Sequence, residues 1–347
     1  MSTRRFFVRN SALAMAGAGA APQWLARAFA AVTPEARKKT LVTIFQRGAA
    51  DGLNVVVPHG EEAYYRLRPT IAIPRPTSRS GRKDDAALDL DGFFGLHPSL
   101  GPLKAWYDQG HLAVVDAVGS PDPTRSHFDA QDYMESGTPG RKATADGWMD
   151  RASTGAPRKA GPLEGIAHRP YAPGGAAYPR GLFGQSLRQI AHAIKSGVGV
   201  EMAFADIGGW DHHVYELGAR PGVGALADRL REFGEGLSAF WQDMGDRMDD
   251  VVIVTLSEFG RTAKENGSRG TDHGHANCMF VLGGRVKGGK VYGKWPGLEE
   301  EQLHEGRGLA RTTDFRDVLG ELVSGHLGHP SLEIVFPGYG PKALGLL

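Results

Sequence analysis

The chain has 347 residues and a formal net charge of +1, with 41% hydrophobic and 9% aromatic residues. This composition fits an ordinary packed core, and the near-neutral charge gives no reason to expect a nucleic acid or an anionic membrane surface as partner. The single cysteine, Cys278, excludes an internal disulfide framework.

The first thirty residues have the features of an export signal. The pair Arg4-Arg5 precedes two aromatic residues, an apolar run covers residues 11–25, and Ala28-Phe29-Ala30 matches a signal peptidase site. The arginine pair predicts export by the twin-arginine (Tat) route, with the Tat translocase as partner during export. The run is shorter than the ~20 apolar residues of a spanning helix, so we expect no stable membrane span after cleavage. We predict a Tat signal peptide over 1–30, a single domain over 31–347, and a periplasmic or extracellular location.

Apolar runs and helical patterns alternate along the rest of the chain. Strands are predicted at Leu41–Phe45, Leu112–Ala117, Val200–Phe204, Val251–Leu256 and Met279–Leu282. Helices are predicted after His97-Pro98, from the N-cap Ser126 to about Glu135, and at Ser186–Lys195, Gly224–Met248 and Phe315–Leu327. Because the strands are apolar throughout, we expect an α/β fold with a doubly wound, mostly parallel sheet flanked by helices.

Polar segments follow these apolar runs. They comprise residues 48–54, 124–127, 206–213 and 257–262, with a further segment at 271–277. In open α/β sheets, ligands bind outside the carboxyl ends of the strands. We therefore expect these distant segments to meet at one edge of the sheet.

Two of the polar segments have the spacing of metal ligands. Asp211 and His213 form an Asp-x-His pattern, and Asp272, His273 and His275 form Asp-His-x-His. Carboxylate oxygen and imidazole nitrogen suit zinc, manganese or iron, and further carboxylates allow magnesium or calcium. Such residues would be enough for two metals that bridge a phosphoryl or sulfuryl group. A surface turn is the alternative for Asp211 and His213.

Three more residues are candidates for a site. Ser126 would place a hydroxyl at the positive end of a helix, which suits a nucleophile or a bound anion, although an N-cap alone would also explain it. Asp51 lies in a glycine-rich turn, where its side chain could instead bond its own backbone. Glu258 comes abruptly after an apolar strand, with only Ser257 between them, which favours a role in the site.

Several of these segments together resemble the bacterial family catalogued as domain of unknown function 1501 (DUF1501). The matching segments are Arg47–Asn54, Ser126–Phe128, Gly208–His213, Ser257–Thr262, Thr271–Asn277 and Thr313–Arg316. That family is similar to the alkaline phosphatase and sulfatase superfamily, in which two metal sites flank a Ser, Thr or formylglycine nucleophile.

This resemblance implies an alkaline-phosphatase-like fold and a distribution of ligands. Asp211, His213 and His275 would supply one metal site, and Asp51, Glu258 and His273 the other, with Asp272 as a further candidate ligand. The chain departs from the superfamily pattern at Glu258-Phe259, where Asp-His or Asp-Asn is usual, and Asp51 comes later than the usual strand-end ligand. One metal, or none, is therefore an alternative to two.

The leading prediction for function is a metal-dependent hydrolase of phosphate or sulfate esters. Its substrate would be a small anionic ester or a sulfated or phosphorylated glycan, and its cofactor zinc, manganese, magnesium or calcium. Ser126 would attack, and Arg261 or Asn54 would hold the anion. The alternative, which the Glu258-Phe259 departure favours, is a non-catalytic periplasmic relative that binds a glycan or a partner through a degenerate metal site. A redox protein is a third hypothesis, without a flavin, haem or cluster motif in the sequence to support it.

Overall fold

The computed structural model of the protein describes residues 38–76, 83–142, 144–153 and 171–347. The predicted signal peptide over residues 1–30 lies outside these residues. Among the described helices, none has both the length and the apolar character that crossing a membrane requires.

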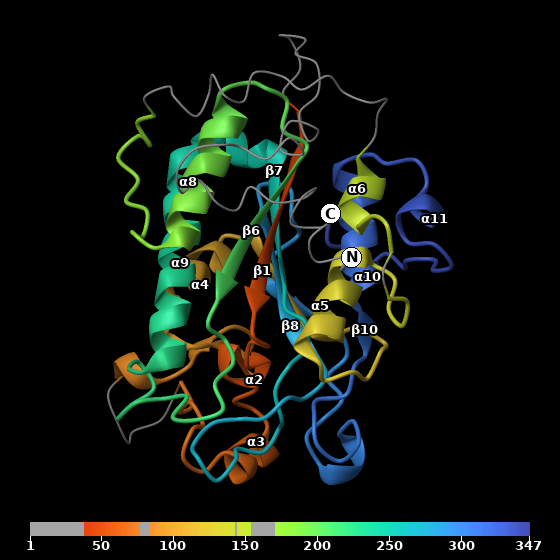
Figure 1. Cartoon of the computed structure of the whole chain (residues 1–347). Helices are drawn as coiled ribbons and strands as arrows, with labels where there is room; N and C mark the ends of the chain where they lie inside the picture. Colours follow the sequence, from red (N-terminus) through yellow and green to blue (C-terminus); the bar gives the residue numbers. More distant parts are fainter. Residues whose placement is uncertain (1–37, 77–82, 143, 154–170) are drawn as a thin grey trace.

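A seven-stranded sheet lies at the centre of the molecule (Figure 1). Its order is β10-β5-β8-β7-β1-β6, and β9 also pairs with β5. The strands are β1 (Thr40–Arg47), β5 (Leu112–Gly119), β6 (Met202–Gly208), β7 (Val251–Leu256), β8 (Asn277–Gly283), β9 (Lys290–Tyr292) and β10 (Thr313–Asp314). All are parallel except β8, which is antiparallel to both of its neighbours, β5 and β7. The predicted mostly parallel sheet is thus confirmed.

Helices cover both faces of the sheet, as a doubly wound fold requires (Figure 1). These helices are α4 (Gly101–Asp108), α5 (His127–Ser136), α6 (Trp148–Ala152), α8 (Leu182–Lys195), α9 (Ala225–Met244) and α10 (Phe315–Glu321). Side chains alternate along β1: Val42 and Ile44 belong to the apolar core that includes residues of α4, α8 and α9, whereas Leu41 and Phe45 belong to the core shared with α6 and α10. Burial on both faces explains why these strands are apolar throughout.

The remaining elements of the described residues are helices, turns and a small sheet. They are α2 (Gly52–Val55), α3 (Glu62–Leu67), α11 (Leu332–Val335), the turns η2 (Lys83–Asp85), η3 (Pro98–Leu100), η4 (Gly245–Asp250), η5 (Glu300–Gln302) and η6 (Leu322–His326), and a second sheet of β2 (Val56–Val57), β3 (Leu88–Asp89) and β4 (Gly95–Leu96). The second sheet, β9 and β10 were not predicted, because strands of two or three residues carry too little pattern to distinguish them from loops.

Five predicted strands and five predicted helical regions are present, with shifted ends. β6 begins two residues later than predicted and extends to Gly208, because its register with β1 continues to the pair Arg47 and Gly208. The helix predicted over Gly224–Met248 ends at Met244 and continues as the 3-10 turn η4. The last predicted helix is α10, followed by the π turn η6.

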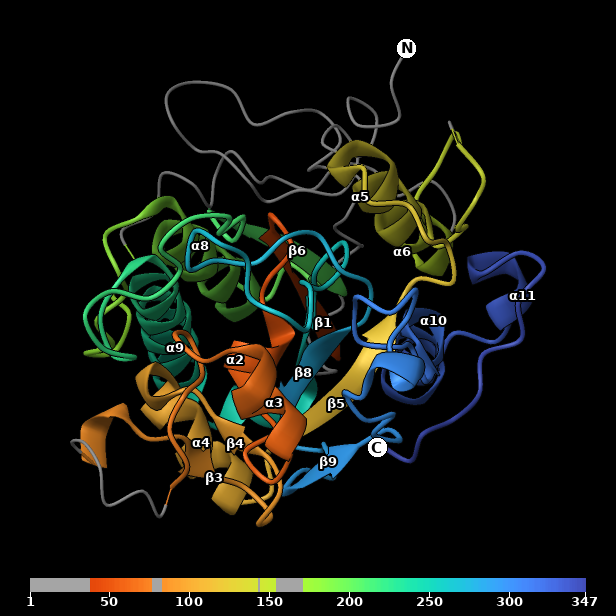
Figure 2. The same ribbon diagram turned by 90° about the horizontal axis from the view of Figure 1, so that it is seen from below.

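The direction of β8 decides where the polar segments lie. Residues 48–54 and 257–262 follow β1 and β7, and residues 206–213 include the end of β6 and the loop after it, so all three segments leave these parallel strands at the same edge. Because β8 runs the opposite way, the segment that precedes it, residues 271–277, lies at this edge too. Figure 2 views the molecule from this side.

Candidate metal centre

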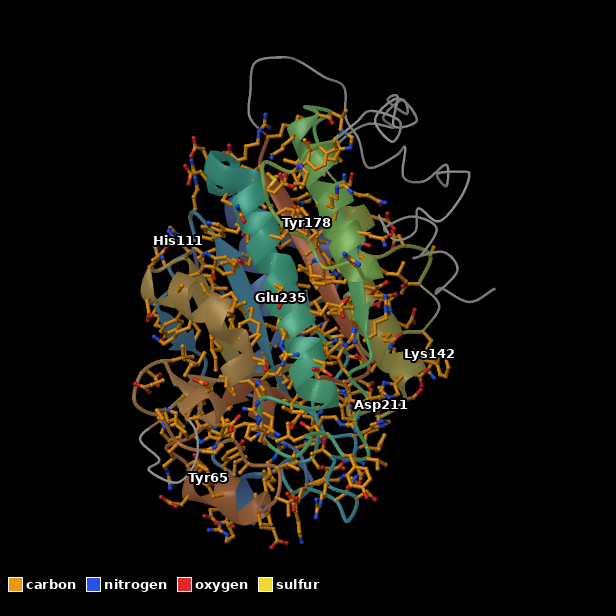
Figure 3. The ribbon with its side chains drawn as sticks, turned by 90° about the vertical axis from the view of Figure 1, so that its left-hand side faces the viewer. Tyr65, His111, Lys142, Tyr178, Asp211 and Glu235 are labelled. Atoms are coloured by element: carbon orange, nitrogen blue, oxygen red, sulfur yellow. The ribbon has the colours of Figure 1, made fainter. Side chains whose placement is uncertain are left out.

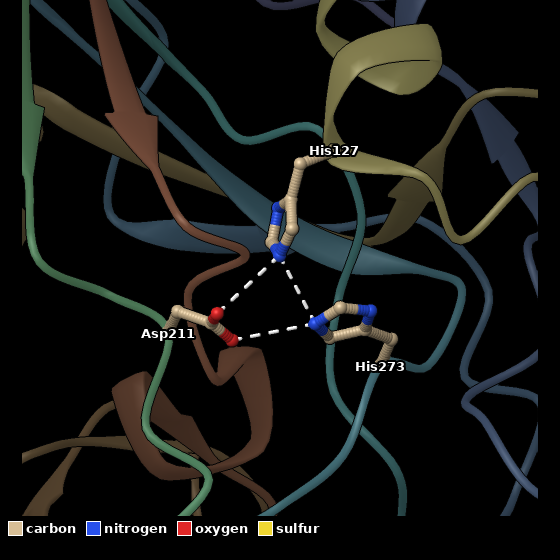
Figure 4. A group of neighbouring side chains, drawn as sticks. All are labelled: His127, Asp211 and His273. Atoms are coloured by element: carbon tan, nitrogen blue, oxygen red, sulfur yellow. Dashed lines mark hydrogen bonds and ion pairs between the residues drawn. The ribbon is translucent and has the colours of Figure 1, made fainter.

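Four side chains meet at this edge, and we call them the His/Asp cluster: His127, Asp211, His213 and His273. Nε2 of His273 lies 3.0 Å from Nε2 of His127 and 3.1 Å from Nε2 of His213. Oδ1 of Asp211 lies 3.0 Å from Nε2 of His213 and 3.3 Å from Nε2 of His273, and its Oδ2 lies 3.5 Å from Nε2 of His127. Figure 4 shows three of the four, whose ligand atoms all lie within 4.8 Å of one another.

The four residues come from three regions of the chain. His127 is the first residue of α5, Asp211 and His213 follow β6, and His273 precedes β8. Asp211 lies toward the lower end of the molecule in Figure 3, beyond the end of β6. Gly48, with φ of +117°, lets this segment approach, since a Cβ there would lie 2.7 Å from the backbone nitrogen of Asp211.

Each histidine of the cluster is oriented by an acceptor behind it. Nδ1 of His127 donates to Glu258 at 2.9 Å, and Nδ1 of His213 donates to Asp272 at 3.0 Å. Nδ1 of His273 donates to the carbonyl oxygen of Arg125 at 3.1 Å. Nδ1 therefore carries a proton in each ring, and in the neutral form of the ring Nε2 has its lone pair facing the cluster.

With the three rings neutral, three lone pairs and one carboxylate converge, and no donor stands among these four groups. Neighbouring acceptors at about 3 Å repel one another, and a divalent cation at their centre would remove this repulsion. Zinc bound at about 2.0–2.1 Å in tetrahedral geometry would place its ligand atoms about 3.3 Å apart, close to the spacing observed here. A carboxylate or carbonyl behind each imidazole is also the usual arrangement around a metal-bound histidine. The residues therefore fit one metal ion.

Charged neighbours set the protonation of the cluster. Burial opposes ionisation of Asp211, but the hydrogen bond and charge of Arg261 outweigh it and hold the pKa of Asp211 below its ordinary value. Burial, together with the charges of His127 and Arg261, lowers the pKa of His273. The hydrogen bond to Glu258 raises the pKa of His127. The carboxylate stays ionised and His273 stays neutral, which are the forms that bind metal.

Arg261 is the buried partner of the cluster. Its side chain is fully buried, and its Nη1 donates to Oδ1 of Asp211 at 2.6 Å. Its Nε donates to Oγ1 of Thr271 at 3.2 Å, and its Nη2 donates to the carbonyl oxygen of the same residue. The guanidinium of Arg261 is therefore fixed beside the cluster by a bond from each of its three nitrogens, and its predicted role in holding the anion stays a prediction.

The structure groups the predicted ligands differently from the expected two sites. His213 and His273, assigned to separate sites by the resemblance, lie in one cluster. His275 lies apart, because its ring stacks on His304 with the ring centroids 3.9 Å apart. Burial lowers the pKa of His275 to about 4.

Glu258 and Asp272 stand behind the histidines rather than among the converging atoms. Glu258 is 1% exposed and accepts hydrogen bonds from the Gly48 backbone at 2.9 Å and from Gln131 at 2.8 Å, besides that of His127. Burial opposes its ionisation, but the hydrogen bonds from His127 and Gln131 outweigh it and lower the pKa of Glu258. Both residues therefore orient histidines in this structure.

Asp51 and Asn54 belong to a separate buried network. Both oxygens of Asp51 accept from Arg68, at 2.5 and 2.9 Å, with the two side chains 1% and 0% exposed. The amide of Asn54 donates to Ile71 and Glu216 and accepts from Tyr64. These contacts occupy the polar atoms that a metal or an anion would need, so the predicted ligand role of Asp51 and anion role of Asn54 gain no support.

Ser126 caps α5 as predicted. Its backbone is extended, with φ of −81° and ψ of 117°, and its Oγ accepts from the backbone N–H of Asp129 at 3.4 Å. Ser126 is exposed and stands between Arg125 and His127, both of which contact the cluster. A role as nucleophile remains a prediction.

His127 was not among the predicted ligands. The sequence analysis placed it in a polar segment at the predicted edge but considered only its neighbour Ser126. The sequence did contain a signal for His127 as a ligand. It is the first residue after the N-cap Ser126, so the predicted helix would place its side chain at the edge of the sheet.

Fold and cluster together define an α/β protein with a candidate metal centre at the carboxyl edge of its sheet. Residues 183–321 match the family model described as "Protein of unknown function (DUF1501)". The predicted resemblance to this family is confirmed over these residues, which include Asp211, His213 and His273 but not His127. No curated protein matches the chain in sequence.

The solved structures that are similar to the chain include a periplasmic domain and a superfamily member. The C-terminal periplasmic domain of EcEptC from Escherichia coli, in complex with Zn, is 11% identical and has a TM-score of 0.37, with 72% of this chain and 73% of that chain covered. A protein in the alkaline phosphatase superfamily from Vibrio parahaemolyticus is 7% identical and has a TM-score of 0.35, with 84% of this chain and 71% of that chain covered. Likenesses this distant carry no argument about function.

Proposed function

We propose that this protein is an exported, metal-dependent hydrolase of phosphate or sulfate esters, with the His/Asp cluster as its metal centre. The observation that carries the proposal is the convergence of three imidazole lone pairs and one carboxylate. Each imidazole is held in the metal-binding tautomer by an acceptor behind it. One ion replaces the two that the resemblance implied, because the remaining predicted ligands are engaged elsewhere.

Charge and exposure support an anionic substrate. Three neutral histidines and one carboxylate leave a divalent ion with net positive charge, and the guanidinium of Arg261 lies beside it. The side chains of Asp211 and His213 are 43% and 41% exposed, so a substrate can reach the cluster. An ion held by His127, Asp211 and His273 would keep a fourth position open for the substrate, where it would polarise the ester oxygens and lower the pKa of a bound hydroxyl or water.

Ser126 is the nucleophile in this proposal. It is exposed, and within the described part of the chain its hydroxyl donates to no acceptor. Arg125 and His127 fix its backbone on both sides next to the cluster, and the N-terminus of the ten-residue helix α5 favours negative charge on its oxygen.

Export in the folded state would suit such a centre. The cluster draws on residues from 127 to 273, so it forms only when the chain has folded, and metal loaded in the cytoplasm would have to cross the membrane inside a folded protein. Mass spectrometry of the exported protein should find an N-terminus near Ala31. An intact Met1 on periplasmic material would contradict the export part of the proposal.

Elemental analysis and activity together test the proposal. The purified protein should hold about one transition-metal ion per chain, and Asp211→Ala and His273→Ala should hold almost none. The metal-loaded protein should hydrolyse an aryl phosphate or an aryl sulfate, and Ser126→Ala should lose this turnover while keeping its metal. Protein that stays inert toward both esters after reconstitution with Zn²⁺, Mn²⁺, Mg²⁺ and Ca²⁺ would overturn it.

A further inference from the structure

We propose that Arg125, His275, His304 and Glu305 form a subsite beside the His/Asp cluster that binds a second anionic group of the substrate. We call these four residues the Arg125 subsite. The inference rests on the proposed function for the reaction, but it depends on different residues. It narrows the substrate class to esters that carry an additional phosphate, sulfate or carboxylate group.

Arg125 and His304 flank one carboxylate in the Arg125 subsite, that of Glu305. Nη2 of Arg125 donates to Oε2 of Glu305, and Nε2 of His304 lies 3.8 Å from Oε1 of the same carboxylate. The ring of His275 stacks on that of His304. The carboxylate of Glu305 therefore stands where an external anion would be held.

The subsite has donors that Glu305 does not use. Nε of Arg125 and Nε2 of His304 are both buried and have no hydrogen-bond partner among the described residues. A guanidinium presents its donors as a fork, which matches two oxygens of a phosphate, sulfate or carboxylate. A group with more oxygens than Glu305 offers could use Nε and Nη2 of Arg125 together.

Glu305 is placed so that it can be exchanged. The side chains of Arg125 and Glu305 are 35% and 54% exposed, and exposed ion pairs of this kind contribute little stability. Glu305 has φ of +52° and is followed by Gly306 at +61°, a left-handed turn that is uncommon for glutamate. The hydrogen bond and charge of Arg125 hold the pKa of Glu305 below its ordinary value, so its carboxylate is ionised and mimics an anion.

The subsite adjoins the metal centre through Arg125. The carbonyl oxygen of Arg125 accepts from Nδ1 of His273, while its side chain turns to Glu305. The next residue along the chain is Ser126, the proposed nucleophile. A substrate whose ester lies at Ser126 could thus place its second anionic group, close to the ester, at the Arg125 side chain.

Anion binding to the purified protein gives the first test, with sulfate as probe in calorimetry at constant ionic strength. Glu305→Gln removes the competing carboxylate and should tighten sulfate binding about tenfold, and Arg125→Gln should weaken it at least about tenfold. The controls are Arg66→Gln and Glu299→Gln, from an exposed pair of the same kind with Nη2 and Oε2 2.6 Å apart. Neither control should change sulfate binding.

Kinetics give the second test. Relative to glucose 1-phosphate, glucose 1,6-bisphosphate should have a kcat/KM about tenfold higher in the metal-loaded protein, and His304→Gln should reduce this ratio. The control is Arg66→Gln, which lies outside both the cluster and the subsite and should change neither this ratio nor the turnover of an aryl phosphate.

The two tests separate the subsite from the proposed reaction. Sulfate binding that is the same in wild type, Glu305→Gln and Arg125→Gln would overturn the subsite, even in a protein that binds metal and hydrolyses esters. The calorimetric result stands by itself if the protein proves to be inert, because it needs no turnover. If sulfate binds as expected but glucose 1,6-bisphosphate and glucose 1-phosphate have the same kcat/KM, the assignment of the substrate class is overturned.

Discussion

Nδ1 of His127 lies 2.9 Å from the carboxylate of Glu258, and Nε2 of the same ring lies 3.0 Å from Nε2 of His273. The buried carboxylate thus fixes which nitrogen of His127 faces the cluster. Glu258 also accepts from the backbone of Gly48 and from Gln131, so its own position is determined from two further sides. A residue two positions after the end of β7 is in this way tied to the first turn of the distant helix α5.

Glu258→Gln should weaken metal binding by about 10–100-fold without removing any ligand. The amide keeps an oxygen that can accept from His127, but it loses the charge that stabilises the Nδ1–H tautomer and polarises the ring. Competition with a chromophoric chelator measures the change in Kd. Glu235→Gln, an exposed glutamate on α9 labelled in Figure 3, is the matched control and should bind metal as wild type does. Equal Kd values in the two variants would remove Glu258 from the centre.

His127→Ala and His275→Ala should differ in their response to metal. Metal at 100 times its Kd stabilises a folded protein by about 2.7 kcal/mol, so removal of metal by a chelator should lower the Tm of wild type. His127→Ala should lose this shift because it removes a ligand. His275→Ala should keep it, since the His275 ring stacks on His304 away from the cluster. The reverse result, with the shift lost in His275→Ala alone, would restore the grouping that the resemblance implied.

The fold was predictable from the sequence because each long strand is buried on both faces. Val251–Leu256 is apolar at five of its six positions, and β7 has these same bounds. The antiparallel direction of β8 was not predictable, because an apolar run does not reveal which way a strand crosses the sheet. That direction places His273 at the same edge as Asp211.

Most residues of the candidate site were predictable from the sequence, but the role of each residue was not. Asp211, His213 and His273 were recognised from their spacing, and all three meet. Whether a carboxylate binds metal, orients a histidine or neutralises a buried arginine depends on its partner across the fold. Asp51 faces Arg68, 17 positions away, and Glu258 faces His127, 131 positions away, and neither partner is marked by local pattern.

Asp116 should make the stability of the protein depend on pH. Burial raises the pKa of Asp116 from its ordinary value of 3.8 to about 7, and its Oδ2 has no hydrogen-bond partner among the described residues. Between these values the folded protein keeps the proton and the unfolded chain releases it. The free energy of unfolding should therefore fall as pH rises through this window, by about 2–3 kcal/mol between about pH 5 and pH 8.

Asp116→Asn cannot ionise and should lack this component of the pH dependence. Urea unfolding near pH 5 and pH 8 gives the change in the free energy of unfolding for wild type and for Asp116→Asn. The difference between these two changes is the contribution of Asp116. Val115→Ala, at a fully buried position of the same strand, should lower stability equally at both pH values. A pH dependence that is identical in wild type and Asp116→Asn would show that the Asp116 carboxyl is ionised in the folded protein across this range.

Asp51→Asn and Asp211→Asn should have opposite effects on stability and metal content. Asp51 neutralises the fully buried guanidinium of Arg68, so Asp51→Asn should lower the free energy of unfolding by about 3–5 kcal/mol. The folded fraction of Asp51→Asn should nevertheless keep its metal, because both oxygens of Asp51 are committed to Arg68. Asp211 is 43% exposed, so Asp211→Asn should cost the metal-free protein far less stability while greatly reducing its metal content. Urea unfolding in chelator and elemental analysis of the folded protein measure the two quantities. Loss of metal from folded Asp51→Asn, with stability unchanged, would mean that Asp51 is a ligand after all and that the Arg68 ion pair gives way when metal binds.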